Sequence, residues 1–383
     1  MNRNYISLIL LSFSLACDYS LRILAFTAIP LLAMEISGDD SLYSVPFSAV
    51  YFVALLATFP LSLAMQKFGR KKVFVFASGI STIGGLMILH SITTKNFALL
   101  VAGLGLTGIQ LAAGFYYRFA AIELSPEGKA GRGISMVLAG GVIAALFAPS
   151  FGIYLKADGF YQLFTGYSAL QFLVLLFILC VKFPKIEASK PTMTIFKGLI
   201  QKRKIYLPIL AGVLSYNLMT FIMVASPGAM HHSGINYQGV SLVIQWHMLG
   251  MFLPSFFTGK LMEKWGGHKT LFWGGVITLG AIAANVSGQS LSYYWVGLFL
   301  LGLGWNLTYV AATGLLAKTY EPKEMSMAQG VNEVMILGTN TFTTSMAGIM
   351  VAHLGWTMVN WTILPFTLGI IFLAFYMRKQ ALA

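Results

Sequence analysis

Two pairs of residues with metal-binding side chains lie close together in the second half of the chain. Met219 and Met223 are four residues apart, and His247 and Met251 repeat that spacing a little further on. Residues four apart share one face of a helix, so each pair can present two donor atoms to one point. Thioether sulfur is a soft, neutral ligand that suits Cu(I), and imidazole also binds copper. The two pairs therefore predict a copper site, provided that they lie on neighbouring helices.

The composition shows what kind of element must position these residues. Of the 383 residues, 57% are hydrophobic and only 10% are charged, and the mean hydropathy is +0.77. Apolar runs of about 20 residues, the length that crosses a bilayer, recur twelve times. We therefore expect an all-α membrane protein with twelve transmembrane helices, and the hydropathy excludes a soluble enzyme. The two pairs fall in the seventh and eighth runs.

The basic residues indicate the orientation of the chain. The net charge of +13 is carried by loops on one side and not by a separate basic patch, so no nucleic-acid partner is expected. If the N-terminus is cytoplasmic, every Lys and Arg except Arg22, Lys95 and Lys156 belongs to the cytoplasmic side. The positive-inside rule then predicts that both termini lie in the cytoplasm.

A duplication divides the twelve runs into two sets of six. The segment Gln66–Lys72, which joins the second and third runs, aligns with Glu263–Lys269, which joins the eighth and ninth. Two pseudo-symmetric six-helix halves are typical of a transporter with parallel repeats. The predicted boundaries are 1–181 for the first half, 182–204 for a cytoplasmic linker and 205–383 for the second half.

The two short basic loops resemble the loop signature of the major facilitator superfamily, in which an acidic residue precedes a Gly and basic residues. Gln66 replaces the acidic residue in the first copy, and Gly267 replaces the Arg in the second. The resemblance implies the major facilitator fold and alternating access to a central site. A receptor or a structural membrane protein is the alternative, and the duplication together with the loop signature argues against it.

The Met and His pairs, with the segment Gln245–Phe256, resemble the CcoA-like copper importers, a bacterial branch of this superfamily. That branch carries Met-x-x-x-Met in span 7 and His-x-x-x-Met in span 8. The resemblance implies that Met219, Met223, His247 and Met251 bind copper during import, in support of cytochrome oxidase assembly. It also implies a monomer in the lipid bilayer of the bacterial inner membrane, with copper as its transported partner and no prosthetic group.

Two other interpretations of these residues stay open. In the first, the methionines fill a helix interface and His247 hydrogen-bonds to Asn217 or Gln245. In the second, the chain carries an organic solute, as in riboflavin uptake or drug/proton antiport, since relatives in the same branch are linked to riboflavin. Aromatic side chains would then stack on a flat ring. The candidates are Phe115, Tyr116, Trp246 and Trp305.

Ionisable side chains inside a span are candidates for coupling or gating. Asp18 and Arg22 are one helical turn apart in the first span, so we expect an ion pair, which is either structural or a proton-coupling group. Glu333, early in the eleventh span, is a third candidate unless it simply lies near the cytoplasmic interface. His231 and His232 follow the seventh span on the predicted periplasmic side, where they could capture metal.

Overall fold

The computed structural model describes residues 3–125, 130–183, 198, 201–321 and 324–382, and its regular elements within these ranges are helices. Their contacts divide into two compact units, Met1–Ser189 and Lys190–Ala383. Most of the predicted linker 182–204 lies outside the described residues. The linker therefore stays a prediction.

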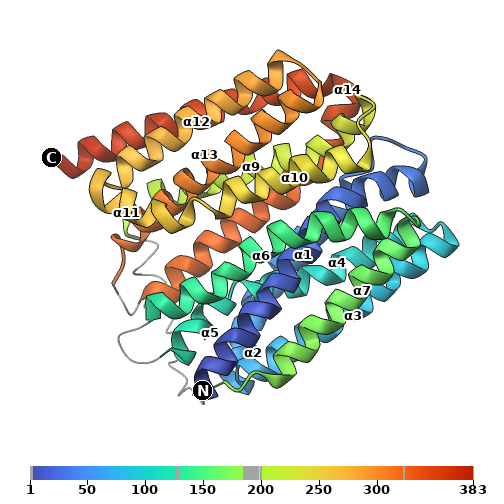
Figure 1. Ribbon diagram of the computed structural model, residues 1–383. Helices are drawn as coiled ribbons and strands as arrows, with labels where there is room; N and C mark the ends of the chain where they lie inside the picture. The colour runs from blue at the N-terminus through green and yellow to red at the C-terminus, as the bar shows by residue number, and fades with distance from the viewer. Residues whose placement is uncertain (1–2, 126–129, 184–197, 199–200, 322–323, 383) are drawn as a thin grey trace. The chain divides into compact units, whose positions relative to one another are not determined.

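The described part of the first unit consists of helices that run side by side (Figure 1). Their apolar sequences leave each backbone N–H and C=O to be satisfied within its own helix, as a bilayer requires. The helices are α1 (Arg3–Ser37), α2 (Val45–Phe68), α3 (Arg70–Thr94), α4 (Phe97–Gly114), α5 (Tyr117–Leu124), α6 (Ala130–Lys156) and α7 (Phe160–Cys180).

The second unit is built in the same way, after a short 3₁₀ turn η1 (Arg203–Ile205). Its described helices are α9 (Tyr206–His232), α10 (Tyr237–Phe252), α11 (Ser255–Trp265), α12 (Gly267–Ser287), α13 (Leu291–Ala317) and α14 (Met325–Leu382).

These helices account for twelve membrane spans. Ten described helices are long and apolar enough to cross a bilayer, and the bent pair of α10 and α11 makes an eleventh span. The long helix α14 holds two spans, because Gly355 inside it leaves the helical conformation with φ 75° and ψ 167°. The chain is therefore a multi-pass membrane protein with six spans in each unit, as the sequence predicts.

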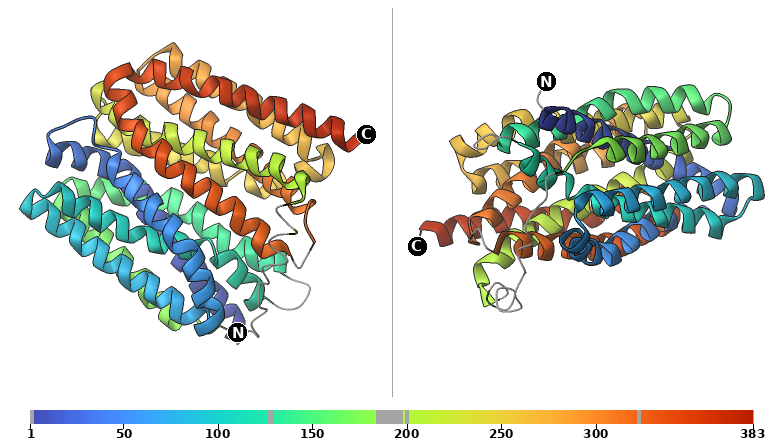
Figure 2. Two further views of the ribbon diagram at one scale, coloured as in Figure 1. Left: turned by 180° about the vertical axis from the view of Figure 1, so that it is seen from behind. Right: turned by 90° about the horizontal axis from the view of Figure 1, so that it is seen from below.

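The two units repeat one internal packing pattern. In the first unit α1 packs against α6 and α7, α2 packs against α4, and α3 packs against α4 and α7. In the second unit α9 packs against α14, α10 packs against α13, and α12 packs against α13 and α14. The first arm of α14 runs beside α9 (Figure 2). The repeat in space follows the duplication in the sequence.

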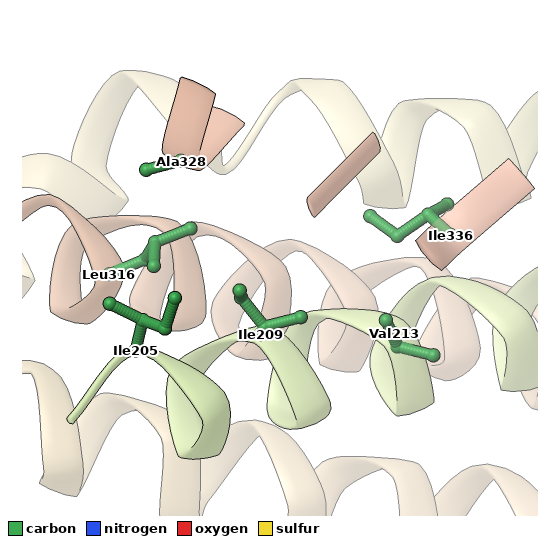
Figure 3. Close-up of a cluster of buried hydrophobic side chains, with 6 residues drawn as sticks. All are labelled: Ile205, Ile209, Val213, Leu316, Ala328 and Ile336. Atoms are coloured by element: carbon green, nitrogen blue, oxygen red, sulfur yellow. The ribbon is translucent and has the colours of Figure 1, made fainter. Parts of the chain in front are cut away.

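An apolar cluster joins α9, α13 and α14 in the second unit. Its members are Ile205, Ile209, Val213, Leu316, Ala328 and Ile336 (Figure 3). Ile205, the last residue of η1, and Ile209 and Val213 of α9 are spaced four residues apart, so their side chains lie on one side of this segment. Tyr216 and Tyr309 pack against the cluster. Since lipid is as apolar as these residues, close van der Waals packing is what favours this contact.

The eighth span is broken between α10 and α11, whose axes differ by about 40°. Pro254 lies at the break and has no backbone N–H to continue the helix. The side chain of Asn306, from α13, donates to the backbone oxygen of Met251 at 2.7 Å and to Ser255 Oγ at 2.6 Å. Thr258 Oγ1 donates to Asn306 Oδ1 at 2.5 Å. One asparagine thus holds residues on both sides of the break.

Close packing of α4 on α2 gives a test of the fold. A Cβ atom at Gly108 would lie 2.3 Å from the backbone oxygen of Val50, whereas a Cβ at Gly79 in α3 would have no neighbour within 4 Å. Gly108→Ala should therefore push the two helices apart, at a cost of about 1–3 kcal/mol. We expect a lower Tm in detergent for Gly108→Ala and an unchanged or higher Tm for the control Gly79→Ala. Equal melting of the two variants would contradict this packing.

Candidate functional site

Both pairs of predicted metal ligands are buried on helices of the second unit. Met219 and Met223 lie on α9, and His247 and Met251 lie on α10. All four are buried, and His247 is 0% exposed. Helix α13 packs against both α9 and α10, so it is a neighbour that the two pairs share. Convergence of the four donor atoms on one ion stays a prediction.

His247 is held by the backbone of α13. Its Nδ1 atom donates to the carbonyl oxygen of Leu298 at 2.7 Å, because a carbonyl can only accept. Within the described residues the buried Nε2 atom has no hydrogen-bond partner. A Cβ at Gly302 would lie 2.4 Å from the backbone oxygen of His247, so this seam of α10 and α13 requires glycine.

The contacts of His247 contradict the expected hydrogen bond to a neighbouring amide. Its expected role as a metal ligand stays a prediction. The imidazole bonds to the Leu298 carbonyl and to neither Asn217 nor Gln245 within the described residues, and Asn217 bonds to residues of α9 and α14. A ring oriented through one nitrogen presents the lone pair of the other nitrogen, which is the arrangement of a metal-bound histidine. The same lone pair can accept a hydrogen bond from an organic solute.

Met219 lies beside a small cavity within the second unit. The cavity has room for about one water molecule. Its lining includes Ser215, Met219, Thr278, Trp305, Thr308 and Ile370, which come from α9, α12, α13 and α14. Ser215 and Thr308 hydrogen-bond to each other through their hydroxyl groups. The Met219 side chain therefore faces a mixed polar and apolar surface.

Three aromatic rings, which we call the aromatic cluster, join this cavity to the apolar core. Trp305 and Tyr309, one turn apart on α13, stack with their centroids 5.0 Å apart and an interplanar angle of 11°. Tyr216 of α9 meets both rings edge-on, at 5.9 and 5.4 Å. The Nε1 atom of Trp305 is buried and has no hydrogen-bond partner among the described residues. The cluster thus combines flat rings with an available N–H donor.

Trp246 belongs to a different environment. It is 38% exposed, and it packs edge-on against Trp295 at 5.5 Å and against Phe299 at 6.1 Å. Of the aromatic candidates from the sequence, Trp305 is therefore the one placed beside the cavity.

In the first unit, the aromatic candidate Tyr116 donates its hydroxyl to the backbone oxygen of Thr58 at 3.2 Å.

A polar strip on the first arm of α14 faces α9. Asn217 donates to Thr339 Oγ1 at 2.7 Å and accepts from Thr343 Oγ1 at 3.1 Å. Between these threonines in the sequence lies Asn340, which is 0% exposed. Within the described residues neither Oδ1 nor Nδ2 of Asn340 has a hydrogen-bond partner. Sequence reasoning missed this residue, although a polar side chain in mid-span was the available signal.

Glu333 lies two turns before Asn340 on the same helix. Its side chain is buried, and it falls inside a candidate membrane span. Residues seven apart share a helix face. The carboxylate and the amide therefore lie on one side of α14.

Asp18 and Arg22 of α1 form the ion pair that their spacing predicts. Nη2 and Nε of Arg22 lie 2.6 and 3.1 Å from Asp18 Oδ2. The Asp18 side chain is buried, and the guanidinium lies 5.0 Å from the centre of the Tyr19 ring. The pair neutralises two charges that would be costly in a bilayer. Its part in coupling stays a prediction.

A second ion pair joins α3 to α5 in the first unit. Arg70, from the basic segment Gln66–Lys72, binds the Glu123 carboxylate through two nitrogens, and Nε lies 2.7 Å from Oε2. Such bidentate pairing fixes geometry as well as charge. The sequence does not identify this partnership, because the two residues are far apart in the chain. The signal that could have found it is an acidic residue after the fourth span on the side of the basic loop.

The predicted capture residues lie at the end of α9. His231 and His232 are exposed, with ring centroids 6.2 Å apart. Among the described residues no group of three or more His, Cys, Asp or Glu side chains could hold a metal ion. The two histidines therefore offer a pair of nitrogens at most, and their role in capture stays a prediction.

Two curated relatives match most of the chain, and a third matches part of it. The riboflavin transporter RfnT of Brucella anthropi is 31% identical over 349 residues, which cover 88% of this chain and 86% of that protein. The uncharacterised transporter YddS of Bacillus subtilis is 26% identical, over 86% of this chain and 81% of its own length. A tetracenomycin C resistance and export protein of Streptomyces glaucescens is 26% identical over a shorter region, 42% of this chain and 30% of that protein.

Solved structures share the fold. A variant of the nucleoside transporter NupG has a TM-score of 0.74 at 14% identity and covers 98% of this chain and 100% of its own. The transporter FucP in its outward conformation has a TM-score of 0.67 at 15% identity, with 98% and 99% covered. At these identities the likeness concerns the fold alone.

The family assignment combines these findings. The sequence pattern of the Major Facilitator Superfamily matches residues 9–208 and again residues 208–382, once for each six-span set. Membership agrees with the duplication, with the repeated packing of the two units and with the relatives, which are transporters and not enzymes. The chain belongs to the Major Facilitator Superfamily of membrane transporters.

Proposed function

We propose that this chain transports an organic solute with a flat aromatic ring system, and that riboflavin is the first candidate. The observation that carries the proposal is the 31% identity to a riboflavin transporter over 88% of the chain. The relatives thus favour the organic-solute alternative of the sequence analysis over copper import.

The aromatic cluster supports this choice of solute. Trp305 lines the cavity, Tyr309 stacks on it, and Tyr216 meets both rings edge-on. Ring faces stack on other flat rings, and the indole N–H can donate to a carbonyl group of the solute. An isoalloxazine ring offers both a flat surface and carbonyl acceptors.

The cellular setting of the proposal follows from charge. Because the basic residues collect on one side of the membrane, we place both termini in the cytoplasm. The Brucella relative favours the bacterial inner membrane as the location. We propose that the chain works there as a monomer in the lipid bilayer, by alternating access.

Uptake of riboflavin by purified protein in proteoliposomes tests the function. Trp305→Ala removes a stacking face and a donor, and loss of one ring–aromatic stack costs roughly 1–3 kcal/mol. We expect initial uptake to fall about tenfold or more, since about 1.4 kcal/mol corresponds to a factor of ten. The control Trp273→Ala changes a 47% exposed tryptophan on α12 and should retain uptake.

Vesicles in which the wild-type protein carries no riboflavin would sink the assignment to that solute. A planar aromatic drug assayed in parallel separates a vitamin carrier from a drug exporter, the activity in the name of the Streptomyces relative.

A second candidate, copper transport, is favoured by one observation. The Nε2 atom of His247 is buried and has no hydrogen-bond partner within the described residues, while Nδ1 is fixed by Leu298. With Met219, Met223 and Met251 it would form a neutral donor set suited to Cu(I). Copper is then the transported substrate and no prosthetic group is needed.

The copper candidate has a matched test on the same chain. The double variant Met223→Ala with His247→Ala removes one donor from each predicted pair. We expect Cu(I) uptake into vesicles to fall at least about tenfold. A control variant, Met346→Ala with Met350→Ala, removes a methionine pair of the same spacing from α14 and should keep its uptake. Copper uptake that is equal in all three proteins would rule out the Met and His site.

We assign proton coupling to the pair of Asp18 and Arg22, with Glu333 as the second acidic candidate. Asp18→Asn alone leaves the arginine without its partner in an apolar span, which costs about 3–5 kcal/mol. The double variant Asp18→Asn with Arg22→Gln removes both charges, so its Tm should recover towards that of the wild type. If Asp18 is the coupling group, this folded double variant moves solute down its gradient but does not accumulate it under a pH gradient. Full accumulation by the double variant would exclude Asp18 as the coupling group and leave Glu333 as the acidic candidate.

A further inference from the structure

Asn340 has the most unsatisfied hydrogen-bonding capacity of the polar side chains considered above. Its amide offers two N–H donors and an acceptor oxygen, yet within the described residues neither Oδ1 nor Nδ2 has a partner. The side chain is 0% exposed and lies inside a membrane span. Leaving such groups unpaired costs free energy, so an unpaired amide needs a reason.

Other buried asparagines of the same unit show how such residues are usually satisfied. Asn217, Asn306 and Asn360 each donate to a backbone oxygen at 2.7 to 2.9 Å. Asn285 donates to Asn360 Oδ1 at 2.8 Å. The fold can therefore pair buried amides, and Asn340 departs from this rule with both of its polar atoms.

The position of Asn340 relates it to the aromatic cluster. Ile336, one turn earlier on α14, packs in the apolar cluster with Val213 (Figure 3). Tyr216 and Tyr309 pack against that same cluster. Asn217, one turn after Val213 on α9, bonds to Thr339 and Thr343, and Asn340 lies between these two threonines in the sequence. The unpaired amide thus lies one turn from the level at which the aromatic rings gather.

The chemistry of the amide indicates what it would bind. Donor and acceptor stand side by side in one plane, which matches a ring edge where a carbonyl stands next to an N–H. Asparagine reads the edge of adenine through such a pair of hydrogen bonds. The imide edge of an isoalloxazine, pteridine or pyrimidine ring has the same side-by-side arrangement.

We propose that Asn340 is a specificity-determining residue that binds the imide edge of a flat heterocyclic solute. The inference rests on the proposed function, because it assigns the hydrogen-bonding side of the same solute. In this arrangement the aromatic cluster supplies stacking, which every flat ring satisfies. Asn340 supplies selection, because only a ring with a neighbouring carbonyl and N–H completes both bonds.

The test compares two solutes in proteoliposomes: riboflavin and riboflavin methylated on its imide nitrogen. Methylation removes the donor and leaves the flat ring intact. We expect the wild type to prefer riboflavin by tenfold or more, and Asn340→Leu to carry the two solutes within about twofold of each other. The ratio of the two uptake rates does not depend on how much of the variant folds. The control Asn360→Leu removes a bonded amide and should keep the wild-type ratio.

Each outcome decides one point. Equal uptake of the two solutes by the wild type, or an unchanged preference in Asn340→Leu, would overturn the role of Asn340 while riboflavin transport stands. A wild type that carries neither solute would instead overturn the proposed function.

Discussion

A bilayer core offers no water to a polar group, and this constraint shapes the whole molecule. Backbone groups are satisfied inside helices, and hydroxyl side chains return to their own helix, as Thr58 does to Ala54 at 2.7 Å and Thr367 does to Ile363 at 3.0 Å. Opposite charges pair within a turn, as in α1. Against this background the few buried polar atoms without a partner become informative, because each one represents a free-energy cost that ordinary packing avoids.

The sequence predicts features whose cause is local. Twelve apolar runs give twelve spans, and the four-residue spacing of Asp18 and Arg22 gives an ion pair. The sequence does not predict contacts between distant segments. Arg70 bonds to Glu123, and His247 bonds to the backbone carbonyl of Leu298 and not to a nearby amide. Every residue has a backbone carbonyl, so no pattern of residue types could have identified Leu298 as the partner of His247.

A local motif and the similarity of the whole sequence point to different solutes. A His and three Met residues make a soft-ligand signature from four positions, whereas similarity to a riboflavin transporter extends over 88% of the chain. Helix packing explains why the two can coexist. Side chains such as Met219 and Trp305 line one small cavity, so residues suited to a metal and residues suited to a flat ring occupy the same surface.

The break in the eighth span makes the course of α11 depend on a neighbouring helix. In an unbroken helix the backbone hydrogen bonds continue from turn to turn, so the helix sets its own direction. Here the hydrogen bonds of Asn306 to Met251, Ser255 and Thr258 bind both segments to α13 at their junction. A side chain of α13 thus stabilises the bend where Pro254 cannot continue the backbone hydrogen bonds of the helix. The same asparagine bonds to the backbone of Met251, so the bend and the predicted metal pair of α10 share one support.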